Sequence, residues 1–203
     1  MRKCAFDFRF ISGFLLAHLL MFFTFHNKVV FWYFFTATML LLICFVVAKD
    51  KLDDKLSVFK YLFTGIVSGA LLFGLFWIGN QFIELIHIPV SNQISALYKR
   101  FGPHMFWQYL ALILIVVPGE EIFWRGFVQK RLVNYLSTGG SIIVSAIMYS
   151  SVHLYSGQFM LPFAALTAGL LWGWLYAWRR SIPLVIVSHL VFDLFLFVLL
   201  PFR

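Results

Sequence analysis

Long apolar segments follow one another along almost the entire chain of 203 residues. An apolar run of about 18 residues or more is typical of a helix that crosses a membrane. Because backbone polar groups inside a bilayer must pair with one another, closely spaced runs of this kind fold as helices. We predict an all-α, polytopic transmembrane bundle of about seven spans, at residues 9–25, 29–48, 58–79, 105–134, 141–156, 159–178 and 182–200.

The composition excludes a soluble domain. Hydrophobic residues make up 62% of the chain and charged residues 12%, whereas soluble domains are about 45–50% apolar and about 25% charged. Cys4 and Cys44 are too few and too far apart for a disulfide framework or a metal knuckle. We therefore expect residues 1–203 to form one integral membrane domain, with residues 80–104 as an interfacial or loop segment.

The net charge of +8 is distributed in a way that argues against binding to nucleic acid. The basic residues cluster at the ends of apolar segments, which is the positive-inside pattern of membrane topology. With a cytoplasmic N-terminus, eleven Lys and Arg residues lie on the cytoplasmic side and four lie outside, while Arg125 stays within the membrane. This asymmetry predicts a cytoplasmic N-terminus. It also predicts that the partner of the protein surface is membrane lipid.

Three ionisable side chains, Glu120, Glu121 and Arg125, interrupt the fourth apolar segment. A single charge at the centre of a membrane helix costs about 2.5–3.5 kcal/mol on insertion scales. Glu121 and Arg125 are one helical turn apart and can form an ion pair, whereas Glu120 points about 100° away from Glu121. We predict that Glu121 and Arg125 give structural support and that Glu120 is the reactive carboxylate. The alternative is a purely structural contact between helices.

Two further apolar segments each carry a polar pair with i, i+4 spacing: Tyr149 with His153, and His189 with Asp193. At a rise of about 1.5 Å per residue, Glu120, His153 and His189 lie roughly 15, 18 and 13 Å from the cytoplasmic side. The common depth predicts that three helices direct these side chains to one buried site. Each histidine could instead make only a hydrogen bond between helices.

A set of two histidines and carboxylates is suited to hydrolysis. A carboxylate or an imidazole can take a proton from water, and a second polar group can stabilise the oxyanion that forms. Glu120, His153 and His189 could also hold a zinc ion that keeps an open position for water. The sequence leaves both alternatives open, so the cofactor is either zinc or none.

These residues resemble a known family. The pattern Glu120-Glu121-x-x-x-Arg125-Gly126, followed by Tyr149-x-x-x-His153 and His189-x-x-x-Asp193, is similar to three ordered motifs of the CAAX-protease and bacteriocin-processing (CPBP, or Abi) family of intramembrane proteases. The resemblance covers about residues 115–197, the expected protease core. It implies an endopeptidase that opens toward the cytoplasm. It also implies that Glu120 and His153 activate water, that His189 and Asp193 hold the oxyanion, and that Glu121 and Arg125 support them.

The resemblance also implies the substrates, which are lipidated proteins in eukaryotic members and peptide precursors in bacterial members. Together with the small size of the chain, it suggests a bacterial cell membrane. Asp193 stands where many members have Asn, and an ionised Asp would repel an oxyanion. This side chain must therefore be protonated, orient His189 or bind a metal. Two other functions remain open: a non-catalytic immunity or scaffold protein, and a proton-coupled transporter that uses buried Glu and His.

Overall fold

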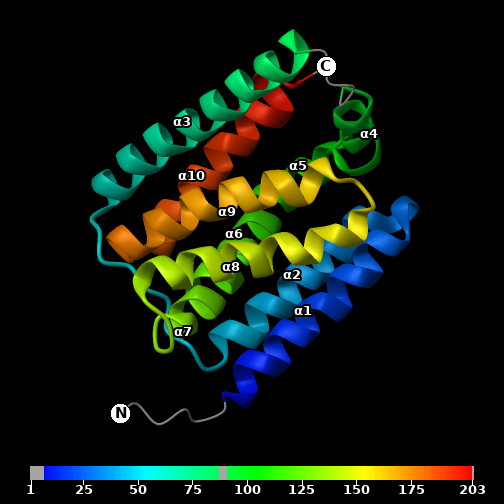
Figure 1. Cartoon of the computed structure of the whole chain (residues 1–203). Helices are drawn as coiled ribbons and strands as arrows, with labels where there is room; N and C mark the ends of the chain where they lie inside the picture. The colour runs from blue at the N-terminus through cyan, green and yellow to red at the C-terminus, as the bar shows by residue number, and fades with distance from the viewer. Residues whose placement is uncertain (1–6, 87–90, 203) are drawn as a thin grey trace.

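The first two apolar segments form an antiparallel pair of helices (Figure 1). This computed structural model describes residues 7–86 and 91–202. Helix α1 (Phe8–His26) begins where the Asp7 side chain accepts a hydrogen bond from the backbone N–H of Phe10 at 2.9 Å. A short 3-10 turn, η1 (Lys28–Val30), then reverses the chain into α2 (Phe31–Val47). Such a cap satisfies one of the free N–H groups at the helix start and so fixes where α1 begins.

Helix α3 (Val58–Leu85) lies along α10 (Ile182–Leu194), and glycines allow the close contact. A side chain at Gly65 would press on Val187, and one at Gly69 would collide with the backbone oxygen of Ser188. Beside these glycines, the Ser68 hydroxyl donates to the Ser188 hydroxyl at 3.0 Å. Small residues four apart, with a hydroxyl pair, are a common way for membrane helices to associate. This contact fixes the position of α10, which carries two of the candidate site residues.

The segment with the acidic motif is one helical rod that contains two π-helical stretches. It comprises α5 (Phe106–Ala111), η2 (Leu112–Val116), α6 (Val117–Phe123), η3 (Trp124–Gln129) and α7 (Lys130–Leu132). Pro118, which has no backbone N–H to donate, lies at the start of α6 directly after the wider turns of η2. π-Helical stretches occur frequently at functional sites. Here the two stretches flank the glutamates on both sides.

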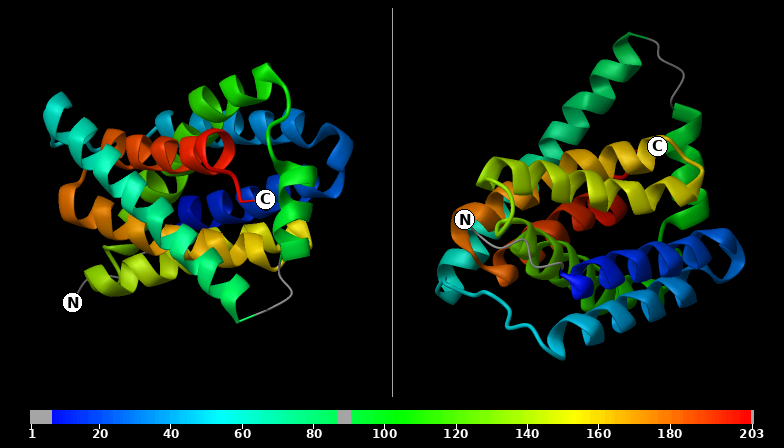
Figure 2. Two further views of the ribbon diagram at one scale, coloured as in Figure 1. Left: turned by 90° about the horizontal axis from the view of Figure 1, so that it is seen from above. Right: turned by 60° about the horizontal axis from the view of Figure 1, so that its bottom comes forward.

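Helices α8 (Thr138–His153) and α9 (Met160–Arg179) pack side by side against this rod (Figure 1). A 3-10 turn, η4 (Leu154–Ser156), and Gly157 with a φ of 66° join them. The short α4 (Ser91–Phe101) lies near the end of the bundle where α8 passes into α9, as the turned views show (Figure 2). The π-helical η5 (Phe195–Leu199) continues α10. No strand occurs in residues 7–86 or 91–202, in agreement with the predicted all-α fold.

Five helices are long and apolar enough to cross a membrane, and they support the prediction of an integral membrane protein. They are Phe8–His26, Lys28–Val47, Val58–Leu85, Met160–Arg179 and Ile182–Leu199. The predicted count of seven spans is not confirmed. The expected span at 141–156 corresponds to α8, which has 16 residues. The expected span at 105–134 is divided by its π-helical stretches and carries the charged motif.

A polar network joins the loop after α2 to α7 and α9. Lys130 pairs with Asp53 at 2.6 Å, and the Tyr176 hydroxyl donates to the same carboxylate at 2.7 Å. Burial alone would raise the pKa of Asp53, but these two hydrogen bonds and the charges of Lys130 and Arg180 outweigh burial and hold its pKa below the usual value. The ionised form of Asp53 is therefore part of the folded structure.

Candidate active site

The Glu121–Arg125 pair is fully inside the bundle. Glu121 is 0% exposed and Arg125 is 1% exposed, and the Nη1–Oε1 distance is 3.2 Å. The Arg125 guanidinium lies 4.8 Å from the ring centre of Tyr149 and 5.4 Å from that of Trp172. Its Nη2 donates to the carbonyl of Gly169 at 3.4 Å. Both partners thus come from α6–η3, as their spacing predicts, and α8 and α9 enclose them.

The Glu120 carboxylate lies between the two histidines. Its Oε1 is 3.7 Å from His153 Nε2, and its Oε2 is 3.8 Å from His189 Nε2. Oε2 also accepts a hydrogen bond from the Tyr149 hydroxyl at 3.3 Å. The structure therefore brings together the polar groups of α6, α8 and α10 that the sequence placed at one depth. The Tyr149 hydroxyl is a contact to Glu120 that the sequence reasoning did not predict.

Each histidine is held through its Nδ1 atom. His153 Nδ1 lies 2.9 Å from the carbonyl oxygen of Tyr149, one turn earlier in α8. His189 Nδ1 lies 2.7 Å from Glu121 Oε1, and the Trp172 ring stacks on the imidazole with centroids 3.8 Å apart. With Nδ1 engaged in this way, the Nε2 atom of each ring faces the Glu120 carboxylate. A partner on one nitrogen fixes the tautomer and the orientation of an imidazole.

Of the three roles that the sequence leaves open for Asp193, the orientation of His189 is not the one that the structure favours. Asp193 was one candidate, because it lies one turn further along α10. Its Oδ2 is 3.7 Å from His189 Nε2, which is too long for a hydrogen bond. Glu121, on a different helix, makes the short contact instead. The stacking of Trp172 was also missed, since nothing in the sequence of α9 marks one of its apolar aromatic residues as different from the others.

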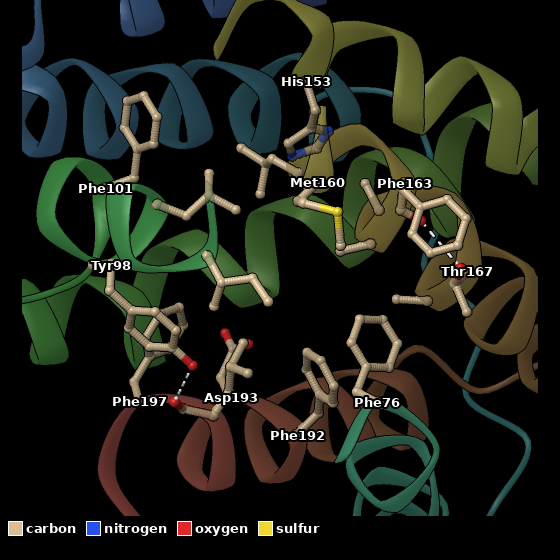
Figure 3. Close-up of a pocket in the computed structure, with 18 of the residues that line it drawn as sticks. Phe76, Tyr98, Phe101, His153, Met160, Phe163, Thr167, Phe192, Asp193 and Phe197 are labelled. Atoms are coloured by element: carbon tan, nitrogen blue, oxygen red, sulfur yellow. Dashed lines mark hydrogen bonds between the residues drawn. The ribbon is translucent and has the colours of Figure 1, made fainter. Parts of the chain in front are cut away.

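A cavity of about 460 Å³ adjoins these groups. Its polar wall includes Glu120, Tyr149, His153, His189 and Asp193. Apolar and aromatic side chains from α1, α2, α3, α4, α9 and η5 form most of the remaining wall, and Figure 3 labels several of them, including Phe76, Phe101 and Phe163. An apolar cavity with a few convergent polar groups is the usual form of a ligand or substrate site.

The arrangement of Glu120, His153 and His189 does not fit the alternative in which these three side chains bind a zinc ion. In residues 7–86 and 91–202, no group of three or more His, Cys, Asp or Glu side chains is placed so that it could hold a metal ion. His153 Nε2 and His189 Nε2 lie beside different oxygens of the Glu120 carboxylate, at 3.7 and 3.8 Å. The arrangement is suited to acid–base chemistry by the side chains themselves.

Residues 102–195 match the family model described as type II CAAX prenyl endopeptidase Rce1-like. This region, slightly less than half of the chain, is similar to the CAAX-protease and bacteriocin-processing family. The CPBP match includes all six candidate site residues and begins after α4, so that α1, α2 and α3 lie outside it. Comparison with curated proteins and with solved structures gave no match.

Proposed function

We propose that this chain is a member of the CPBP family and an intramembrane endopeptidase that hydrolyses peptide bonds of membrane-associated substrates, lipidated proteins or peptide precursors. The observation that carries the proposal is the buried Glu120 carboxylate between the Nε2 atoms of His153 and His189, at 3.7 and 3.8 Å. The family match supports proteolysis in general. The apolar cavity beside the three groups suits a substrate with an apolar chain next to the cleaved bond.

Glu120 and His153 are placed to activate water. Their separation of 3.7 Å is too long for a direct hydrogen bond, and one water molecule can contact both groups. The Nδ1–H of His153 donates to the Tyr149 carbonyl, which leaves Nε2 as an acceptor. Glu120 takes a proton from the water as it attacks the carbonyl carbon, and then transfers this proton to the leaving amine. His153 positions the water through its second hydrogen bond.

His189 is placed to hold the oxyanion. When both ring nitrogens are protonated, Nδ1–H donates to Glu121 and Nε2–H is free to donate to the oxyanion in the cavity. The Glu121 carboxylate compensates the positive charge of this ring, and Arg125 in turn balances Glu121. Asp193 lies 3.7 Å from the same Nε2. As a carboxylate it would oppose an oxyanion, so this mechanism uses its protonated, hydrogen-bond-donating form.

A comparison of peptides tests the proposal. Membrane and secreted peptides are collected from cells that carry the wild-type protein, Glu120→Gln or Glu84→Gln at matched abundance. Glu84 is exposed on α3 and provides the matched control. We expect a defined precursor to accumulate uncut only with Glu120→Gln. Identical peptide profiles with the biological activity preserved would favour an immunity or scaffold protein. Solute flux that depends on a proton gradient, without new peptide termini, would favour a transporter.

A further inference from the structure

The cavity at the candidate active site extends toward one end of the bundle. Its lining residues include Phe31 at the start of α2, Phe101 at the end of α4 and Met160 at the start of α9. Figure 3 shows Phe101 and Met160 on its walls together with Phe197 from η5. We call this the open end of the bundle: the end with the α1–α2 and α8–α9 junctions and α4. Within the described chain, none of the lining residues comes from 48–57, 130–138 or 179–182, which lie at the other end.

Toward that other end, the site is closed by a packed layer. Beyond the Glu121–Arg125 pair lie Gln129, Leu175 and Tyr176, each 0–1% exposed. The Gln129 amide donates to the Gly173 carbonyl at 2.7 Å and so joins η3 to α9 in this layer. The layer separates the catalytic groups from the loop after α2. A substrate that reaches Glu120 must therefore approach from the open end or from the adjoining lipid.

The positive charges collect at the closed end. Of the Lys and Arg residues that the structure describes, nine lie there and three lie at the open end, while Arg125 is internal. The nine are Arg9, Lys49, Lys51, Lys55, Lys60, Lys130, Arg131, Arg179 and Arg180, and the three are Lys28, Lys99 and Arg100. An excess of Lys and Arg in short loops marks the cytoplasmic side of a membrane protein. By this rule the closed end is cytoplasmic.

We infer that the active site opens to the extracytoplasmic side of the membrane. This inference rests on the proposed function and narrows its substrates to membrane-bound peptide precursors whose cleaved bond has already crossed the membrane. The direction is opposite to the cytoplasmic opening that the family resemblance implies. Glu120 precedes Lys130 by ten residues, so the bond is cut roughly 15 Å from the closed end, near the middle of the bilayer. A precursor must therefore enter the outer half of the membrane in an extended, locally unfolded form.

Cysteine labelling tests the orientation without any need for activity. Cys4 and Cys44 are replaced by serine, and one new cysteine is placed at the open end (Phe159→Cys) or at the closed end (Lys55→Cys). Both positions are exposed, and neither belongs to the proposed catalytic set. We expect a membrane-impermeant maleimide to label Phe159→Cys in intact cells and to label Lys55→Cys only after permeabilisation. The reverse pattern, or labelling of both in intact cells, would overturn the inference. If the cell does not produce Phe159→Cys, Leu154→Cys replaces it at the open end. If the cell does not produce Lys55→Cys, Lys49→Cys replaces it at the closed end.

A pair of reporters tests which side of the membrane supplies the substrate. One candidate precursor sequence is fused to a membrane anchor that presents it outside and to another that presents it inside. We expect cleavage of the outward reporter alone, lost with Glu120→Gln. Cleavage of the inward reporter alone would contradict the inference. If neither reporter is cut while the labelling pattern is as expected, the orientation holds and it is the proposed proteolysis that fails.

Discussion

The substitution Arg125→Met removes one partner of a buried ion pair and leaves the other in place. Glu121 and Arg125 are 0% and 1% exposed, so water cannot solvate the remaining carboxylate. At 3.2 Å and an effective dielectric constant of about 20, Coulomb's law gives an attraction of about 5 kcal/mol. Loss of one partner of a buried pair typically costs about 3–5 kcal/mol. Because Glu121 keeps its contact with His189 at 2.7 Å, we expect a loss near the lower end of this range, about 3 kcal/mol.

The free energy of unfolding in detergent, measured for four proteins, checks this value. They are the wild type, Arg125→Met, Glu121→Gln and the double variant. If the two side chains interact as the structure indicates, the double variant should lose less free energy than the sum of the two single losses. Arg125→Lys is the matched control, because it keeps the positive charge but loses the guanidinium group, whose Nη2 donates to the Gly169 carbonyl. If Arg125→Met unfolds with the wild-type free energy, or if the two single losses add without a difference, the two side chains do not stabilise each other.

Four further predictions follow from the site, the α3–α10 contact and the polar network. Glu120→Gln should lower the cleavage rate about 10²–10⁴-fold through loss of the general base, as measured on a reporter substrate. Asp193→Asn keeps a hydrogen-bond donor and should stay within about tenfold of wild-type activity, whereas Asp193→Ala should lower activity about 10²-fold. Equal cleavage rates for these two variants would contradict the donor role of Asp193. Gly69→Ala should cost about 1–3 kcal/mol of unfolding free energy by collision with α10; Gly74→Ala, which meets open space, is the control. Asp53 has a lowered pKa, so its contribution to stability is complete above about pH 4 and is lost as the pH falls through its folded pKa. Asp53→Asn should reduce the loss of unfolding free energy at acid pH. An unchanged dependence of the unfolding free energy on pH would contradict this role of Asp53.

The sequence predicted the central site through two simple regularities. Polar side chains four apart share one helix face, and three such groups at one depth can meet inside a bundle. The structure brings Glu120, His153 and His189 together in this way. The Glu121–Arg125 pair follows from the same spacing.

Other features depend on contacts between helices, which no local pattern encodes. The partner of His189 Nδ1 is Glu121 on α6, although Asp193 is nearer in sequence. Trp172 was not distinguishable from the other aromatic residues of α9 until its ring was seen stacked on His189. The π-helical stretches η2 and η3 also have no counterpart among the sequence predictions, which give one continuous apolar segment over residues 105–134.

The cavity wall has a consequence for how such proteins can diverge. Helices α1, α2 and α3 lie outside the CPBP match, yet Phe25, Phe35 and Leu75 from these helices line the cavity. The residues proposed for chemistry all lie within the match. Substitutions in the first three helices can therefore reshape the space for the substrate without altering any proposed catalytic side chain. Exchange of these helices between relatives is thus a direct route to new substrate preferences around an unchanged set of proposed catalytic side chains.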